Sequence, residues 1–191
     1  MRYTGENMDA PLARAELIGA RLIVWDHDKG NLLYRLGFFG KPVGVSKPKP
    51  GERFEAPLTL DLMEGIYLKE RGLIKVYDPA TGGEVGIRQL LKLAEASYKN
   101  FSKSYRIYRE LRDKGYIVTP GIKFGSDFAV YERGPGIDHA PYIISVRDKE
   151  DVMDPSEIVR AGRLATTVRK QFIVAMPGKN LRFFLFRWFK A

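Results

Sequence analysis

The stretch from Gly121 to His139, GIKFGSDFAVYERGPGIDH, constrains the fold of this chain more than any other part of its sequence. Its first part, residues 123–132, has the extended, alternating pattern of a β-strand. Its second part, residues 134–140, is rich in glycine and proline and predicts a loop that presents a histidine. The stretch therefore favours a β-sheet in which one strand ends at a polar, exposed loop.

The segments on either side of this stretch complete a mixed pattern of helices and strands. Asp154, followed by Pro155 and Glu157, is a strong helix start, because it combines an N-cap, a proline at the first helical position and an acidic N3 residue. We expect that helix to continue to about Arg169. The other predicted elements of the second half are a helix from Leu90 that continues through 101–114, strands 116–119 and 142–146, and a closing hairpin of 172–176 and 181–189.

The first half repeats this mixture in a separate predicted unit. Its predicted elements are one or two strands over 12–25, a turn at 26–30, a helix over 31–39 closed by Gly40, a loop over 41–51, a helix over 58–71 and a strand over 73–77. The stretch DPATGGEVG, residues 78–86, is rich in turn-forming residues. We therefore predict an α/β (α+β) protein with a small N-terminal mixed α/β domain, residues 1–85, and a C-terminal nuclease-like α/β domain with a central mixed sheet, residues 86–191.

Charge separates the two halves. The chain has 32 Lys and Arg against 23 Asp and Glu. Residues 1–85 hold 12 of each sign, so residues 86–191 hold 20 basic and 11 acidic residues and carry the whole net charge of +9. A positive field concentrated on one domain suits a polyanion such as nucleic acid, although a basic surface that only aids solubility has the same composition.

Composition excludes several kinds of chemistry. The chain has no cysteine and only two histidines, His27 and His139. Disulfides, thiolate chemistry and His-rich metal sites are therefore impossible, which leaves carboxylate-bound Mg²⁺ as the only plausible metal chemistry. No nucleotide-binding glycine motif occurs, and we expect no cofactor. We also expect no membrane span and a cytoplasmic location.

Tyr131, His139 and Lys170 could converge, since they follow or precede neighbouring elements of the second domain. Each also has an ordinary structural explanation. A tyrosine at a strand end is usually packing, a loop histidine is usually exposed, and a lysine after a helix commonly complements the helix dipole. Spacing alone favours these structural explanations.

A resemblance to a known family changes this balance. YIVTPGIKFGSDFAVYERGPGIDHAPYIISV, followed by DPSEIVRAGRLATTVRKQFIVA, resembles the catalytic domain of the tRNA-splicing endonucleases of archaea and eukaryotes. LYRLGFFGKP and LTLDLMEGIYLKERGLIKVYD resemble their N-terminal domain more loosely. The family pattern is lysine-phenylalanine-glycine, then a tyrosine, a loop histidine and a lysine after the next helix. It implies that Tyr131, His139 and Lys170 are catalytic.

The resemblance also implies a reaction that needs no metal. The 2′-hydroxyl of the RNA attacks its own 3′-phosphate in a transesterification, with Tyr131 as base, His139 as general acid and Lys170 as the stabiliser of phosphoryl charge. The products would carry a 2′,3′-cyclic phosphate and a 5′-hydroxyl. An ordinary tyrosine has a pKa of about 10, so Tyr131 could act as a base at neutral pH only if a nearby cation stabilised its ionised form. Without such a cation, Tyr131 would only orient the hydroxyl.

Precursor tRNA with a bulge-helix-bulge intron junction is the substrate that the family implies. Bulge bases can be splayed out and stacked on aromatic or guanidinium planes, and by position Arg163 and Trp188 could form such a clamp. Ordinary explanations exist for both, as a solvated helix residue and an interface residue. Lys41, Lys47 and Lys49 lie in a Pro-rich and Lys-rich loop that could contact the phosphate backbone or simply be solvated.

One segment departs from the family pattern. Many members carry an acidic loop between the last two strands that docks into a neighbouring subunit, whereas this chain has Pro177, Gly178, Lys179 and Asn180 there. We therefore expect the chain to pair with a second, structural subunit that supplies the acidic loop, as an α2β2 heterotetramer joined through the apolar final strand.

Two other functions remain open at this point. One is a Mg²⁺-dependent nuclease that uses carboxylates such as Asp127 and Glu132, although the usual spacing of such carboxylates is not evident. The other is a non-catalytic RNA-binding or scaffolding subunit, against which the complete Tyr131, His139 and Lys170 set argues.

Overall fold

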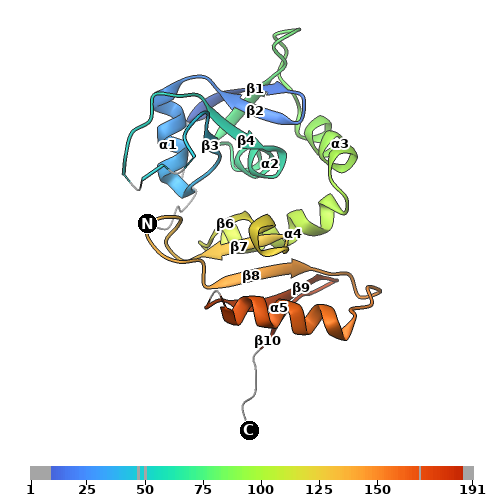
Figure 1. The fold of residues 1–191 in the computed structure, drawn as a ribbon. Helices are drawn as coiled ribbons and strands as arrows, with labels where there is room; N and C mark the ends of the chain where they lie inside the picture. Colours follow the sequence, from blue (N-terminus) through green and yellow to red (C-terminus); the bar gives the residue numbers. More distant parts are fainter. Residues whose placement is uncertain (1–9, 47, 50, 168, 187–191) are drawn as a thin grey trace. The chain divides into compact units, whose positions relative to one another are not determined.

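The structure is a computed structural model that describes residues 10–46, 48–49, 51–167 and 169–186 (Figure 1). The chain divides into two compact units, Met1–Phe101 and Ser102–Ala191. Each contains a five-stranded sheet with both parallel and antiparallel pairs, so the predicted mixed α/β class is confirmed. The units divide later than the composition change at 85 and 86, because the helix that follows this change packs against the first unit.

In the first unit the sheet has the strand order β3-β4-β2-β1-β5. Among the described strands of this sheet, only β1 and β5 run parallel. Alternate residues of these strands, such as Leu22, Leu60 and Val76, are buried where helices α1 and α2 pack. The elements are β1 Ala13–Ile18, β2 Arg21–Val24, α1 His27–Gly37, β3 Lys41–Pro42, β4 Leu58–Asp61, α2 Leu62–Glu70, β5 Ile74–Tyr77 and α3 Ile87–Ser97.

The predicted helix end at Gly40 is wrong, because α1 ends at Gly37 and Phe38 takes the left-handed C-cap position with φ of 54°. Two helix starts in the first unit also differ from the sequence prediction, because aspartates cap the helices. The predicted turn at 26–30 is wrong: Asp26 accepts a hydrogen bond from the Lys29 amide at 3.0 Å, so α1 starts at His27. The predicted helix over 58–71 is wrong at its start. Leu58–Asp61 is a strand that pairs with β2, and α2 begins only after the capping box of Asp61 and Glu64.

The second unit has the strand order β10-β9-β8-β7-β6. Helix α5 connects the parallel strands β8 and β9, and the other neighbours are antiparallel. Figure 1 shows α4 and α5 on opposite faces of this sheet. The elements are α4 Phe101–Asp113, β6 Ile117–Pro120, the short 3-10 helix η1 Ile122–Phe124, β7 Phe128–Tyr131, β8 Tyr142–Val146, α5 Pro155–Thr167, β9 Gln171–Pro177 and β10 Leu181–Phe186.

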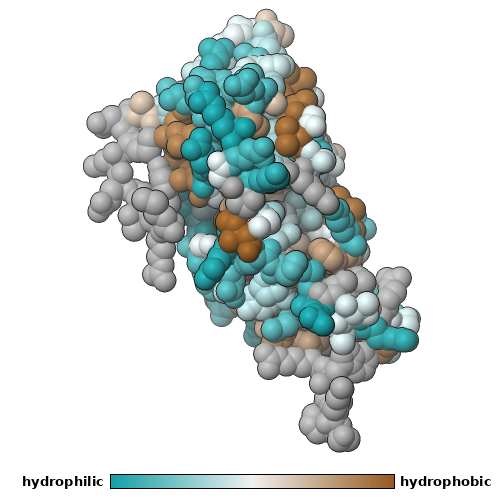
Figure 2. Space-filling view, turned by 60° about the vertical axis from the view of Figure 1, so that its left-hand side comes forward, coloured by the Kyte–Doolittle hydropathy of each residue, from teal (hydrophilic) through white to brown (hydrophobic). Residues whose placement is uncertain are grey.

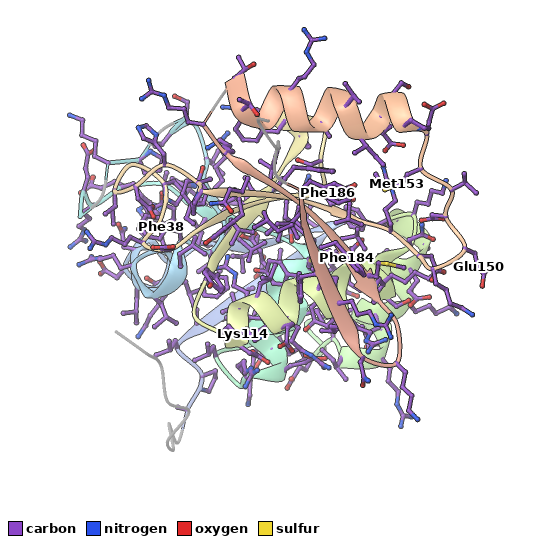
Figure 3. The ribbon with its side chains drawn as sticks, turned by 90° about the horizontal axis from the view of Figure 1, so that it is seen from below. Phe38, Lys114, Glu150, Met153, Phe184 and Phe186 are labelled. Carbon is purple, nitrogen blue, oxygen red and sulfur yellow. The ribbon has the colours of Figure 1, made fainter. Side chains whose placement is uncertain are left out.

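Aromatic and aliphatic side chains fill both faces of the second sheet. On the α4 face, the rings of Tyr108 and Phe128 lie 6.1 Å apart. On the other face, Ile143, Phe172 and Val174 form a buried cluster against which Ala161 of α5 and Met153 pack. Met153 is labelled in Figure 3, where it lies between the start of α5 and the strands.

The predicted helix start at Asp154 is confirmed, since α5 begins at Pro155 and Asp154 accepts a hydrogen bond from the Ser156 amide at 2.7 Å. Two other predictions here are wrong in part. The helix over 90–114 is interrupted at Asn100, whose left-handed backbone, with φ of 56°, cannot continue a right-handed helix. The strand over 123–132 is shorter because Gly125, also left-handed, ends η1 before β7 starts.

On the face shown in Figure 2, hydrophilic side chains predominate and hydrophobic ones gather in small patches. None of the helices in the described part of the chain is both long and apolar enough to cross a bilayer.

Candidate active site

Strand register brings the ends of three strands together at one edge of the second unit. Val130 of β7 pairs with Tyr142 of β8, and Tyr142 pairs with Gln171 of β9. At the same end, one step beyond this row, lie Tyr131 at the end of β7 and Lys170 just before β9. Because neighbouring strands are about 4.8 Å apart, the backbones of these two residues are separated by roughly 10 Å, a distance that their side chains can bridge.

Lys170 is held against the segment that carries His139. Its Nζ donates a hydrogen bond to the carbonyl oxygen of Ala140 at 2.6 Å, and the Gln171 amide donates to the Pro141 carbonyl at 2.8 Å. Nζ also lies 5.1 Å from the ring centroid of Phe124, within cation–π range. Lys170 and the residue that follows His139 are therefore in direct contact.

The surroundings of Lys170 act on its charge in opposite directions. Partial burial lowers the pKa of the ammonium from its ordinary value of 10.5, and the nearby Asp138 carboxylate raises it. Burial is the larger effect. Lys170 is thus partly removed from water, so its positive charge interacts more strongly with a phosphate than a fully solvated ammonium would.

Tyr131 is the half-buried last residue of β7. Burial raises its pKa above the ordinary value of 10.0, Asp138 raises it further, and a hydrogen bond with the Thr119 side chain lowers it. The net shift is upward, opposite to what a base at neutral pH requires. The phenol of Tyr131 therefore remains protonated at neutral pH in the RNA-free protein.

His139 is exposed at the end of the loop that joins β7 and β8. Its neighbour Ala140 is buried and receives the hydrogen bond of Lys170. An exposed imidazole on an anchored backbone can reach a bound substrate and exchange protons with it.

The residues predicted to contact RNA lie in different parts of the chain. Arg163 is exposed on α5 of the second unit. Lys41 and Lys49 are exposed in the first unit. Lys47 and Trp188 lie outside the described residues.

Sequence reasoning did not assign a site role to Phe124 or Asp138. The KFG motif places Phe124 in η1, where its ring faces the Lys170 ammonium. Asp138 directly precedes His139, and an acidic residue beside a loop histidine was the signal that could have drawn attention to it.

The carboxylates considered for Mg²⁺ are placed differently from one another. Asp127 accepts a hydrogen bond from the Val146 amide at 2.7 Å. This bond joins the start of β7 to the end of β8, so Asp127 has a structural role. Glu132 is exposed. Within the described ranges, no three Asp, Glu or His side chains are grouped closely enough to hold a metal ion together.

The last strand, β10, is an edge strand with apolar residues on both faces. Phe183, Phe184, Leu185 and Phe186 are 36 to 45% exposed. Phe184 and Phe186 are labelled in Figure 3. An apolar edge strand of this kind can pair with another chain.

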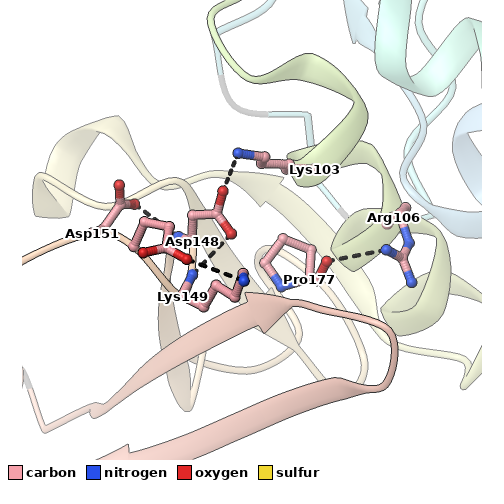
Figure 4. A network of polar contacts seen from close by, with 7 residues as sticks. Lys103, Arg106, Asp148, Lys149, Asp151 and Pro177 are labelled. Atoms are coloured by element: carbon pink, nitrogen blue, oxygen red, sulfur yellow. Dashed lines mark hydrogen bonds and ion pairs between the residues drawn. The ribbon is translucent and has the colours of Figure 1, made fainter.

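The turn before β10 is attached to its own helix α4. The Arg106 guanidinium donates hydrogen bonds to the carbonyl oxygens of Pro177 and Gly178 at 3.0 and 3.1 Å. Nearby, Lys103 forms an ion pair with Asp148, as Figure 4 shows together with the Arg106 contact to Pro177.

Both units match known protein families. Residues 13–91 match the family model for the N-terminal domain of tRNA intron endonuclease, and residues 101–182 match that for its catalytic C-terminal domain. The chain is also similar over nearly its whole length to curated proteins from archaea. It is 47% identical to the tRNA-splicing endonuclease of Hyperthermus butylicus over 182 residues, which are 94% of this chain and 99% of the relative. With the tRNA-splicing endonuclease of Saccharolobus solfataricus it shares 36% identity over 94% of this chain and 100% of the relative. The chain therefore belongs to the tRNA-splicing endonuclease family and carries the catalytic domain of that family.

Proposed function

We propose that this chain is the catalytic subunit of an endonuclease that excises introns from precursor tRNA at bulge-helix-bulge junctions without a metal ion. The observation that carries the proposal is the contact between Lys170 and Ala140, together with the strand register that puts Tyr131 at the same edge. These contacts support the proposal because the backbones that carry Tyr131, His139 and Lys170 lie near one end of the sheet.

The proposed reaction is an in-line transesterification. The 2′-oxygen forms a bond to the adjacent phosphorus, and the bond from phosphorus to the 5′-oxygen of the next nucleotide breaks. His139 gives a proton to the departing 5′-oxygen, and the Lys170 ammonium balances the charge that grows on the phosphoryl oxygens. The products carry a 2′,3′-cyclic phosphate and a 5′-hydroxyl.

Tyr131 has a narrower role in this proposal than that of a fully ionised base. Because its pKa is raised, the phenol oxygen receives a hydrogen bond from the 2′-hydroxyl and orients it toward phosphorus. The 2′-proton passes to solvent water as the new bond to phosphorus forms, so the phenol of Tyr131 stays neutral. The negative charge that grows on the phosphoryl oxygens is the charge that Lys170 stabilises.

Substrate recognition extends the proposal to residues outside the catalytic set. Arg163, exposed on α5, and Trp188 would stack on a bulge base that has left the helical stack. Lys41, Lys47 and Lys49 would contact the phosphate backbone through their Pro-rich loop. The cytoplasmic location predicted from the sequence stays a prediction.

Assembly with a second subunit is part of the proposal. The exposed apolar residues of β10 need a partner surface, and a structural subunit that carries an acidic loop would supply both that surface and the loop that this chain lacks. Arg106 holds the turn at Pro177 and Gly178 against α4. A turn held in this way is poorly suited to reach into a neighbour, which supports an α2β2 heterotetramer.

Cleavage of a bulge-helix-bulge RNA in EDTA tests the proposal. The chain is incubated alone and with a co-purified partner, and the ends of the products are identified by their response to phosphatase and kinase. We expect cyclic phosphate and 5′-hydroxyl ends, and no cleavage of an RNA with 2′-deoxyribose at the scissile position. Activity that disappears in EDTA and returns with Mg²⁺ would instead favour a carboxylate-based nuclease.

A further inference from the structure

The carboxylate of Asp138 closes the loop between β7 and β8, which runs from Tyr131 to His139. Its Oδ2 accepts hydrogen bonds from the amides of Glu132 and Arg133 at 3.2 and 3.1 Å, and its Oδ1 accepts one from the Gly134 amide at 2.8 Å. The residue before this group of amides is Tyr131, and the residue after Asp138 is His139. One carboxylate therefore joins the two ends of the loop.

The loop also closes through its own backbone. The amides of Ile137 and Asp138 both donate to the Gly134 carbonyl, each at 3.1 Å. Gly134 is buried and has φ of 130°, a backbone conformation that favours glycine. Bonds to a carboxylate are stronger than those between neutral groups, so the three amide contacts dominate this closure.

We propose that Asp138 is a positioning residue that fixes the separation of Tyr131 from His139 and provides the negative charge next to Lys170. This inference rests on the proposed function, because it assigns Asp138 a task in the same cleavage reaction. Asp138 acts through its neighbours and is not itself proposed to touch the RNA.

The electrostatic effects of Asp138 agree with this position. Its charge raises the pKa of both Tyr131 and Lys170, which shows that the carboxylate lies near each of them. It favours the ammonium form of Lys170 and the protonated form of Tyr131, the two states that the proposed reaction uses.

Substitution separates positioning from RNA binding. Asp138→Ala removes all three amide contacts. Asp138→Asn keeps one oxygen that can accept hydrogen bonds from these amides, but its NH₂ group cannot accept a hydrogen bond. Displacement of catalytic groups by about 1 Å can cost on the order of 100-fold in rate, so we expect single-turnover cleavage by Asp138→Ala to fall by about 10- to 100-fold. The Asn variant should be intermediate, and the dissociation constant for RNA should change by less than about 3-fold in both, because Asp138 makes no proposed RNA contact.

Asp151→Ala is a matched control in the same unit. Asp151 accepts a hydrogen bond from the Asp148 amide at 2.7 Å in the loop that follows β8. The proposed site lies at the start of β8, so the five residues of this strand separate the two loops by about 17 Å. We expect the control to cleave at the wild-type rate.

Amide hydrogen exchange measures the closure of the loop without any substrate. In the Asp138 variants the amides of Glu132, Arg133 and Gly134 should exchange faster than in the full-length wild-type chain, whereas those of β8 should not change. Two results would overturn the positioning role alone. One is unchanged amide exchange in the Asp138 variants. The other is cleavage by Asp138→Ala within about 2-fold of the wild-type rate while His139→Ala is inactive. A wild-type chain that fails to cleave, even with its partner subunit, would overturn the proposed function on which the inference rests.

Discussion

The Lys170 ammonium donates a hydrogen bond to the carbonyl oxygen of Ala140, the residue directly after His139, at 2.6 Å. The next residue, Gln171, continues the contact through its amide to Pro141. Lys170 and Ala140, which are 30 positions apart in the sequence, are thereby held together. The parallel pairing of β8 and β9 brings these two backbone segments side by side, because Tyr142 pairs with Gln171.

Lys170→Ala should remove most of the cleavage activity. Loss of one group that stabilises transition-state charge typically costs about 100- to 1,000-fold in rate, and we expect a loss of this size in single-turnover cleavage. Lys170→Arg should recover only part of the activity, because a planar guanidinium cannot reproduce the point contact to Ala140. Lys149→Ala is the control, since Lys149 is exposed at the other end of β8. Equal activity of Lys170→Ala and the control would contradict the assigned role.

The sequence predicts much of this arrangement because strand alternation and helix capping are local. The start of α5 at Asp154 and Pro155 follows from side chains within four residues of one another. The contact between Lys170 and Ala140 depends on register between strands, which local patterns do not determine. The proposed catalytic residues could therefore be selected only through the family resemblance.

The errors of the sequence prediction also have local physical causes. Residues 58–61 alternate between leucine and polar residues, as a strand does. The sequence prediction assigned them to the helix that follows, because their leucines also fit its apolar face. Asn100 gave no clear signal that it would adopt a left-handed conformation and divide α3 from α4. Asp138 was missed because its role depends on three backbone amides rather than on another side chain.

The alkaline side of the pH profile should report Lys170. Burial lowers its pKa, so the ammonium is lost at a lower pH than the ordinary 10.5, and the cleavage rate should fall as pH rises through that region. Tyr131 has a raised pKa, so its phenol stays protonated to a higher pH than an ordinary tyrosine does. Lys170→Arg should move the decline upward, since a guanidinium stays charged, whereas Tyr131→Phe should lower the rate and leave the decline in place. A decline that vanishes in Tyr131→Phe would assign the titration to tyrosine.

Arg163→Ala should weaken RNA binding. Loss of a stacked guanidinium on a bulge base should raise the dissociation constant by about 5- to 30-fold. The effect should be much smaller on a fully paired RNA of the same length, because that RNA presents no unstacked base. Arg88→Ala, at an exposed position of α3, is the control for charge alone. An equal loss for both variants would indicate general electrostatic attraction.

Gly65→Ala should destabilise the first unit. A Cβ at Gly65 would lie 1.8 Å from Cδ1 of Leu22, a fully buried residue of β2, so the Leu22 side chain would have to change rotamer inside the packed core or α2 would have to move. Overpacking of this kind costs about 1 to 3 kcal/mol, which should appear as faster hydrogen exchange of the β2 amides. Gly83→Ala, in an exposed turn without positive φ, should have little effect. In the double variant Gly65→Ala with Leu22→Ala, the two costs should be less than additive, because the shorter side chain makes room for the methyl group.

Phe184→Lys should prevent assembly through β10. Phe184 is 45% exposed on an edge strand, and a charge there would have to be buried if a partner covered the strand. We expect the variant to sediment at a lower mass than the wild-type chain with its partner and to lose cleavage in proportion to the loss of assembly. Leu32→Lys is the matched control, since Leu32 is 41% exposed on α1 of the first unit and has no proposed partner. If Phe184→Lys retains the wild-type mass, the subunits associate through another surface. If it is monomeric and fully active, the catalytic set is complete in one chain, and the proposed heterotetramer is not needed for cleavage.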